Sequence, residues 1–232
     1  MRINRYLARC GYGARRNVEE FITSGRISVN GQVVTDFSTR INPEDEVKFD
    51  DMLVKPILKD QVLILNKPVG YLCSHMDVHH EKTVLNLLPE HFRRLNIAGR
   101  LDLNSRGLMI FSSDGDFIYK LTHPSYHVEK EYRLKISPCP EESFLVSTFL
   151  RGVEEGGDFL RAKKVVIENV EEGIVLVTLQ EGKKRQLHRM FEVIGSDVLD
   201  LQRIRIGNLK LEDLDLKEGE YKEVSKEEIL SY

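Results

Sequence analysis

The residue best suited to chemistry in this chain is Asp102, which lies between Arg100 and Asn104 in a segment bracketed by Gly99 and Gly107. The apolar run Leu108 to Phe111 follows directly and is long enough for a buried strand. A carboxylate held at the mouth of a buried strand can act as an acid, a base or a nucleophile. The alternative is that Asp102 only caps a turn and pairs with Arg100 at the surface.

Tyr132 is a second residue that we expect to point inward. The segment 128–136 alternates as a strand, with Val128, Tyr132, Leu134 and Ile136 on one face and charged residues on the other. The alternative is a purely structural role, in which Tyr132 is a core tyrosine whose hydroxyl bonds to a polar partner.

The basic segment from Lys183 to Arg189 is a third candidate. We predict that residues 181–195 form a helix ended by Gly195, because Leu187, Met190, Phe191 and Ile194 repeat at helical spacing. The opposite face carries Arg185, His188 and Arg189, with Lys183 and Lys184 just before them. This pattern indicates a helix with one core face and one basic face.

These candidates must be positioned by a chain of 232 residues with 41% hydrophobic and 31% charged residues, which is typical of a globular protein. No apolar run approaches the length of a membrane span, and Arg2, Arg5 and Arg9 interrupt the first apolar residues, so we expect no signal peptide. Three scattered cysteines indicate neither a disulfide framework nor a zinc site. We therefore expect a cytoplasmic protein, and a monomer.

The net charge of −3 is unevenly distributed. Residues 1–35 carry six arginines against Glu19 and Glu20, a balance of +4, which leaves −7 for the remainder. Local basic patches on an acidic chain favour a polyanion bound at defined places, although solvated surface charge would give the same count.

The first fifty residues predict two short helices, over residues 2–10 and 14–24, and then a hairpin turning at Asn30-Gly31. Many further strands joined by hairpins, without regular alternation of strand and helix, predict an α+β fold on a mostly antiparallel sheet. We expect one domain over residues 1–50, a linker over 51–60 and a second domain over 61–232. A helix after Asp114, the hairpin strands 165–170 and 174–179, and a helix capped by Ser225 and Glu228 are also expected.

Three histidines, His75, His79 and His80, stand at helical spacing and could suggest a metal. Nothing in the sequence supplies further matched ligands, so we expect a polar loop and no metal site there.

The N-terminal sequence R-I-N-R-Y-L-A-R-C-G-Y-G-A-R-R-N-V-E-E-F-I-T-S-G-R-I-S-V-N-G resembles an S4 RNA-binding domain. The resemblance implies contact with folded RNA, mainly through phosphates. It implies that the RNA-binding side chains include the guanidinium groups of Arg2, Arg5, Arg15, Arg16 and Arg26.

The remainder resembles the RNA pseudouridine synthases, in the branch of bacterial ribosomal enzymes that carry an N-terminal S4 domain. The motifs are G-R-L-D-x-x-S-x-G-L, E-K-E-Y and E-G-K-K-R-Q-L-H-R-M-F-E-x-I-G, with K-P-x-G at Lys67 to Gly70 and R-I-R-I-G at Arg203 to Gly207. The resemblance implies isomerisation of uridine to pseudouridine in ribosomal RNA, without a cofactor or metal, on a base flipped out of its stack.

The resemblance also implies roles for single residues. Asp102 matches the catalytic aspartate, Tyr132 the tyrosine on which the target uracil stacks, and Arg100 the arginine that fills the gap left by the flipped nucleotide. Gly99 and Gly107 would give clearance for that nucleotide. Lys183, Lys184 and Arg185 would contact RNA.

One position departs from the pattern: the arginine or lysine that pairs with the catalytic aspartate falls on His188. A histidine must be protonated to carry the same charge, and Arg185 or Arg189 could supply that charge instead. Two rival functions stay open. One is a non-catalytic RNA-binding or ribosome-assembly factor on this fold, and the other is a glycosidase pairing Asp102 with Asp114 or Asp116.

Overall fold

The computed structural model describes residues 1–13, 15–56, 61–74 and 82–229, and it leaves the side chains of residues 15–17 undescribed. His75, His79 and His80 lie outside the described residues, as does the segment 57–60. Within the described part of the chain, no helix is long and apolar enough to cross a membrane.

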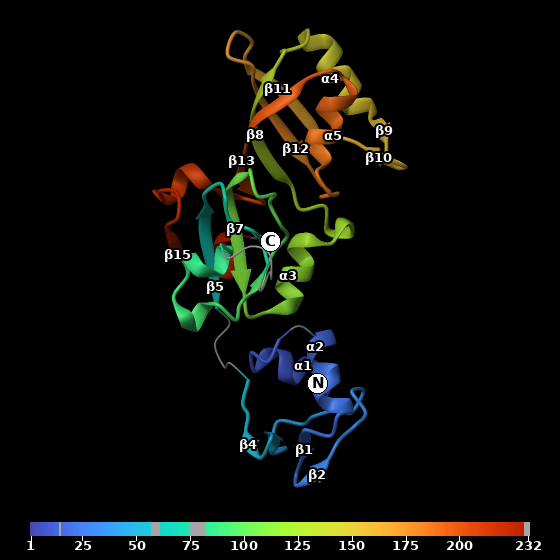
Figure 1. Cartoon of the computed structure of the whole chain (residues 1–232), viewed down its shortest axis with the longest axis vertical. Coiled ribbons are helices and arrows are strands. Elements are labelled where there is room, and N and C mark those ends of the chain that lie inside the picture. The colour runs from blue at the N-terminus through green and yellow to red at the C-terminus, as the bar shows by residue number, and fades with distance from the viewer. Residues whose placement is uncertain (14, 57–60, 75–81, 230–232) are drawn as a thin grey trace.

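The N-terminal unit, residues 1–54, has two helices packed on a four-stranded sheet in the order β2-β1-β3-β4 (Figure 1). The hairpin turns at Asn30 and Gly31, whose φ angles of 50° and 78° are the paired positive values of a type I′ turn. The elements are α1 (Ile3–Arg9), α2 (Arg15–Thr23), β1 (Ile27–Val29), β2 (Gln32–Val33), β3 (Val47–Phe49) and β4 (Met52–Leu53).

Strand β4 corrects the predicted linker over residues 51–60. Met52 and Leu53 pair with β3, and Val54 is buried in the core of the N-terminal unit. A strand of two exposed residues that follows Asp50 and Asp51 has no alternation from which it could be predicted.

The rest of the molecule is built around a nine-stranded sheet, in the order β11-β12-β8-β13-β7-β5-β15 with β14 on β13 and β6 on β7 (Figure 1). Among the described strand pairs only β7 and β13 run parallel, so the α+β, mostly antiparallel prediction is confirmed. The strands are β5 (Val62–Lys67), β6 (Asn96–Ile97), β7 (Arg106–Ser112), β8 (Lys130–Ser137), β11 (Lys164–Asn169), β12 (Ile174–Leu179), β13 (Asp197–Ile206), β14 (Leu209–Lys210) and β15 (Tyr221–Glu223).

Cores on both faces explain the uninterrupted apolar runs 62–65 of β5 and 108–111 of β7. Leu63 and Met109 belong to one core, with α4 (Glu142–Arg151) and α5 (Gln186–Val193). Ile64 and Leu108 belong to the other, with α3 (Gly115–Thr122) and α6 (Lys226–Ile229). A strand buried on both sides needs apolar residues at every position. The short 3-10 helices η1 (Val84–Leu87), η2 (Glu90–Phe92), η3 (Pro124–Tyr126) and η4 (Leu211–Leu214) complete the fold.

The predicted helix caps are present. Asp114 accepts a hydrogen bond from the Asp116 backbone N–H at 2.9 Å and so caps α3. Ser225 and Glu228 bond each other's backbone N–H groups before α6. Asp114 is therefore used in capping, which removes it as a partner carboxylate for a glycosidase.

The C-terminal half contains one hairpin that was not predicted and one prediction that needs correction. The hairpin consists of β9 (Val153–Glu155) and β10 (Asp158–Leu160), which are separated by Gly156 and Gly157. The helix predicted over residues 181–195 begins only at Gln186, because Arg185 has a left-handed backbone with φ of 50°. Lys183 to Arg185 therefore lie in a loop before α5.

Candidate active site

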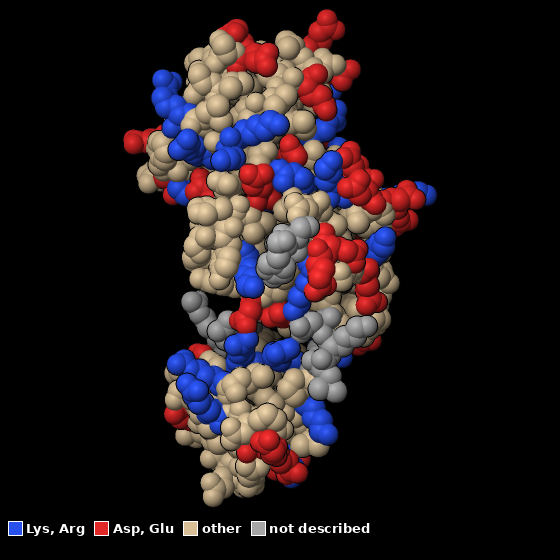
Figure 2. All heavy atoms as spheres, turned by 180° about the vertical axis from the view of Figure 1, so that it is seen from behind, with Lys and Arg blue, Asp and Glu red and all other residues tan. Residues whose placement is uncertain are grey.

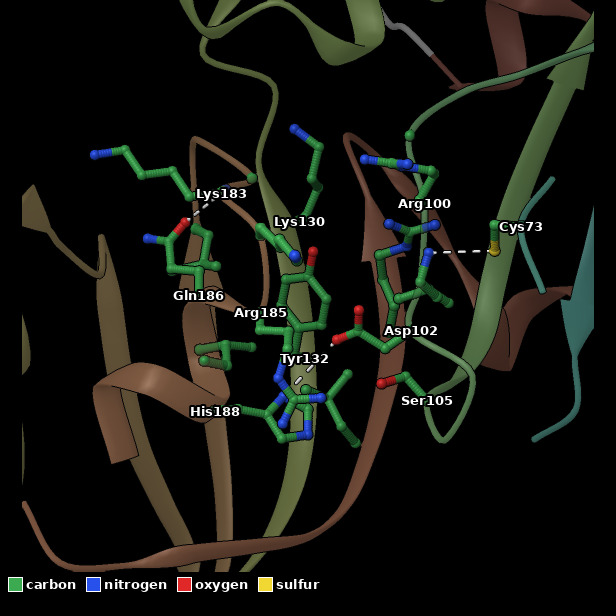
Figure 3. Close-up of a pocket in the computed structure, with 18 of the residues that line it drawn as sticks. Cys73, Arg100, Asp102, Ser105, Lys130, Tyr132, Lys183, Arg185, Gln186 and His188 are labelled. Atoms are coloured by element: carbon green, nitrogen blue, oxygen red, sulfur yellow. Dashed lines mark hydrogen bonds and ion pairs between the residues drawn. The ribbon is translucent and has the colours of Figure 1, made fainter. Parts of the chain in front are cut away.

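A cavity of about 560 Å³ opens where the loop before β7 meets β8, β13 and the loop before α5. Its lining includes Asp102, Tyr132, His188, Lys130 and Arg185 (Figure 3). Arg203 lines the same cavity. The three motifs that are far apart in sequence therefore meet in one place.

Asp102 is held by its backbone, and its carboxylate stays available to the cavity. The side chain of Lys67 is fully buried, and its ammonium donates to the carbonyls of Ser105 at 2.6 Å, Asp102 at 3.2 Å and Leu103 at 3.4 Å. Burial lowers the pKa of Lys67. The Asp102 carboxylate itself is 40% exposed, so a ligand can reach it.

Cys73 supports the other end of the same loop. Its sulfur accepts a hydrogen bond from the Leu101 backbone N–H at 3.3 Å (Figure 3). Burial raises the pKa of this thiol, which therefore stays neutral and serves as an acceptor.

Tyr132 lies on β8 and is 7% exposed, so the predicted inward direction is confirmed. Its backbone is paired with Val177 of β12 on one side and with Arg203 of β13 on the other. Central strands hold it on both sides, so the ring is a fixed part of the cavity wall (Figure 3).

His188, rather than Arg189, lies beside Asp102. The His188 Nδ1 atom is 3.9 Å from Asp102 Oδ2, an ion-pair distance that counts only when the imidazole is protonated. Burial lowers the pKa of His188 and the positive Arg185 lowers it further, while Asp102 acts in the opposite direction. Near neutral pH the imidazole is therefore mostly uncharged.

Arg189, expected as a catalytic residue, points out of the cavity. Its guanidinium forms ion pairs with Glu155 and with Asp158, the latter at 2.9 Å, and it donates to the Lys184 carbonyl at 3.3 Å. Successive helical residues project about 100° apart, so His188 and Arg189 cannot both face Asp102. Arg189 instead clamps the β9–β10 hairpin to the basic loop.

The remaining basic residues divide between the rim and their own partners. Arg100 and Lys184 line the cavity and are exposed. Lys183 lines it too, but its ammonium donates to the Phe159 carbonyl at 2.7 Å and lies 3.5 Å from Asp158. The loop 183–185 therefore forms an edge of the cavity and is held in place by contacts with the β9–β10 hairpin and Arg189, rather than being one face of a helix.

The role expected for Gly107 is wrong, and the structure gives another one. A Cβ at this position would lie 2.3 Å from the Arg203 carbonyl oxygen, so β13 could not pair with β7 if any side chain were present. Gly107 therefore gives clearance for a strand, not for a nucleotide. At Gly99 the positive φ of 75° explains the glycine.

Sequence reasoning missed Lys130 and Arg203, two cations that line the cavity and are 9% and 2% exposed. Lys130 is two residues before Tyr132, so the period of two that placed Tyr132 inward also placed Lys130 inward. For Arg203 the only signal was its place in the R-I-R-I-G motif.

The N-terminal unit carries a second basic cavity, of about 340 Å³, lined by Met1, Arg2, Asn4, Arg5 and Arg40. Figure 2 shows lysine and arginine side chains gathered on the part of this unit that faces the rest of the molecule.

Two arginines of the N-terminal unit have acidic partners. Arg5 forms an ion pair with Asp116 of α3. Arg26 pairs with Asp50 and lies 4.6 Å from the ring centre of Phe49. The side chains of Arg15 and Arg16 lie outside the description.

No group of three potential metal ligands occurs among the residues that the structure describes.

Comparisons with known proteins agree with this architecture. Residues 1–47 match the S4 domain model and residues 61–193 match the RNA pseudouridylate synthase model. The chain is 34% identical to ribosomal small subunit pseudouridine synthase A of Escherichia coli, over 100% of this chain and 99% of that protein. It is 33% identical to an uncharacterized RNA pseudouridine synthase of Aquifex aeolicus, over 99% of this chain and 94% of that one.

A solved structure, described as a crystal structure of pseudouridylate synthase, superimposes with a TM-score of 0.70 at 30% identity, covering 99% of this chain and 98% of that chain. Both the family model, which spans more than half of the chain, and the full-length relatives point the same way. This chain is a member of the RNA pseudouridine synthase family.

Proposed function

We propose that this enzyme converts a specific uridine of small-subunit ribosomal RNA to pseudouridine, with Asp102 as the catalytic carboxylate. The observation that carries the proposal is the exposed Asp102 carboxylate, fixed through its backbone by buried Lys67 and sharing a cavity with Tyr132. The choice of RNA is supported by relatives of nearly equal length that are named for the ribosomal small subunit.

The reaction requires little beyond these side chains. The C1′–N1 bond breaks, the uracil turns, a C1′–C5 bond forms, the C5 proton leaves to solvent and N1 gains a proton. No electrons are exchanged with a second compound, so the chemistry calls for no redox cofactor. Asp102 acts either as a nucleophile or as a base, toward the sugar or the ring.

The target nucleotide has to leave its helix, because a paired and stacked base cannot lie against Tyr132, which is 7% exposed in the cavity wall. Tyr132 offers a flat apolar surface for the flipped uracil, which lowers the cost of unstacking. Arg100, exposed at the rim, is placed to reach into the RNA that the base has left. Lys183, Lys184 and Arg185 border the same opening and would contact the backbone phosphates.

The N-terminal unit supplies binding rather than chemistry. We assign RNA contact to residues 1–50, with the guanidinium groups of Arg2 and Arg5 facing a shared cavity, and catalysis to residues 61–232. Arg26 holds Asp50 in an ion pair, so it contributes to RNA binding only by exchanging that carboxylate for a phosphate.

The test uses small-subunit RNA carrying tritium at C5 of uridine, because isomerisation releases that hydrogen to water. Wild-type protein should release tritium, and a nuclease digest should contain pseudouridine. Asp102→Asn should slow release by a factor of about 10³ or more while RNA affinity stays near that of the wild type.

Asp114→Asn is the matched control, since asparagine caps a helix as well as aspartate does. It should keep nearly full activity. Normal turnover by Asp102→Asn would overturn the catalytic assignment. RNA binding without any isomerisation by the wild type would favour a non-catalytic factor, and release of free uracil would indicate a glycosidase.

A further inference from the structure

Two buried cations, Lys130 and Arg203, line the cavity without a carboxylate partner among the described residues. Lys130 donates to the Val128 carbonyl at 3.0 Å, and Arg203 donates through Nε to the Leu108 carbonyl at 2.8 Å. Buried cations are ordinarily paired with acids. A site that holds two cations on main-chain carbonyls alone is suited to a ligand that carries, or acquires, negative charge.

Arg203 has a donor with no hydrogen-bond partner among the residues that the structure describes. The residue is 2% exposed, and its buried Nη2 atom makes no hydrogen bond. An unsatisfied buried donor costs free energy. The bond from Nε to Leu108 fixes the orientation of the guanidinium plane, so the free donor is held in position before any ligand arrives.

The position of Arg203 relative to Tyr132 follows from strand register. The two residues are directly opposite each other on antiparallel strands β13 and β8. Opposite residues project from the same face, with Cβ atoms about 5 Å apart. A ring stacked on Tyr132 therefore presents an edge to the Arg203 guanidinium. Gly107 makes this arrangement possible by letting β7 pair closely with the Arg203 backbone.

We propose that Arg203 is a further catalytic residue, which donates a hydrogen bond to a ring oxygen of the flipped uracil, O2 or O4. This proposal rests on the proposed function. When the C1′–N1 bond breaks with its electron pair on the base, N1 shares the negative charge with O2 and O4. A fixed cationic donor at one of these oxygens stabilises that charge more than it stabilises the neutral ring, and so it lowers the barrier.

The ligand oxygen belongs to the base rather than to a phosphate. Each phosphate is tied to neighbouring nucleotides and stays near the rim, where Arg100 and Lys184 are exposed. A base stacked on Tyr132 lies beside Arg203, because the two residues are paired opposite each other and both line the cavity. A donor aimed at O4 would also reject cytosine, which carries an amino group at that position.

Lys130 strengthens the same effect. Burial lowers its pKa to about 8, and the neighbouring Arg203 contributes to the lowering. The mutual repulsion of these cations would be relieved when the ring becomes negative, which again favours the cleaved state over the ground state.

A chemical double-mutant cycle tests the contact. RNA is prepared with uridine, 2-thiouridine or 4-thiouridine at the target position, since sulfur accepts hydrogen bonds less well than oxygen. Single-turnover rates are measured for the wild type and for Arg203→Met by chromatography of the nuclease digest. We expect the wild type to be about 10-fold slower on one of the two thio substrates, and Arg203→Met to be at least about 10²-fold slower on uridine.

The decisive comparison is between two single-turnover rates of Arg203→Met. This variant should react with uridine and with the thio substrate that slows the wild type at the same rate, because the hydrogen bond that distinguishes them is gone. If Arg203→Met is slower than the wild type by the same factor on all three substrates, Arg203 has only a structural role. If Arg203→Met fails to fold, Arg203→Lys takes its place, and equal wild-type rates on all three substrates overturn the proposal without any variant. A phosphate contact would appear instead as a changed salt dependence of RNA affinity.

The control Lys164→Met changes an exposed lysine on β11 and should leave all three rates unchanged. A wild type that leaves unmodified RNA unchanged contradicts the proposed function itself, so the two failures are distinguishable.

Discussion

The N-terminal unit and the cavity both concentrate positive charge, but they hold it in opposite ways. Arg5 and Arg26 are more than two-fifths exposed and are paired with Asp116 and Asp50. Lys67, Lys130 and Arg203 are buried and donate mostly to main-chain carbonyls. Exposed pairs form and exchange at little cost, whereas buried cations on carbonyls cannot move without leaving polar groups unsatisfied.

This difference separates binding from chemistry. A carboxylate that occupies an exposed guanidinium is replaced by a phosphate with little net change in energy, so RNA can displace the acidic partners of the N-terminal unit. If the proposed isomerisation takes place in the cavity, the cavity has to be preorganised, because charge develops there only while the bond breaks. Substitutions in the two regions should therefore fail in different ways.

The largest effect is expected at Lys67. Lys67→Met leaves the carbonyls of Ser105, Asp102 and Leu103 without their buried donor, which should lower the free energy of unfolding by about 3 kcal/mol. Activity of the folded fraction should fall as well, because the Asp102 loop loses its support. Urea denaturation and tritium release measure the two effects.

Lys164→Met, at an exposed position of β11, is the control for Lys67→Met and should change stability by less than about 0.5 kcal/mol. If the two variants unfold at the same urea concentration, the buried Lys67 contributes no more to the free energy of unfolding than the exposed Lys164, and the comparison fails.

A smaller effect is expected from the pH response of His188. Burial and Arg185 lower its folded-state pKa, so below the ordinary value of about 6.5 the unfolded chain takes up a proton that the folded state resists. Wild-type stability should therefore decrease relative to His188→Asn as pH falls through 6.5, and the difference should level off below the folded pKa. Above pH 7 it should be constant.

Thermal melting between pH 5 and 8 tests this expectation, with Asp102→Asn as a second background. Asp102 is the neighbour that favours protonation of His188, so its removal should extend the loss of stability to lower pH. A wild type that gains stability relative to His188→Asn on acidification would show that His188 is a charged partner of Asp102 in the free enzyme.

The sequence predicted the parts of this fold that depend on local pattern. The Asn30-Gly31 turn, the Asp114 cap and the inward direction of Tyr132 each follow from residues close together in the chain. Strand β4 and the β9–β10 hairpin escaped prediction because two or three residues carry no period. The resemblance to the pseudouridine synthases identified the three motifs whose residues line the cavity.

The remaining site features depend on contacts between distant residues. That Gly107 accommodates Arg203 follows from a parallel pairing between strands ninety-odd positions apart, which no local pattern encodes. That His188 rather than Arg189 faces Asp102 depends on where α5 begins and on the acidic hairpin that captures Arg189. Lys130 was the exception, since the alternation of β8 already placed it beside Tyr132.

The smallest effect is expected in the N-terminal unit, where Arg5 and Asp116 form an exposed pair. Arg5→Ala should weaken RNA binding only a few-fold and reduce the slope of log affinity against log salt by about 0.7 to 0.9, the loss of one phosphate contact. Asp116→Asn keeps Arg5 and frees it, so it should bind RNA at least as tightly as the wild type with an undiminished slope. Titrations of RNA from 50 to 300 mM salt compare the three proteins. Equal slopes for Arg5→Ala and the wild type would mean that Arg5 serves to hold the two units together, and its charge would then belong with the structural cations of the cavity rather than with the exchangeable ones.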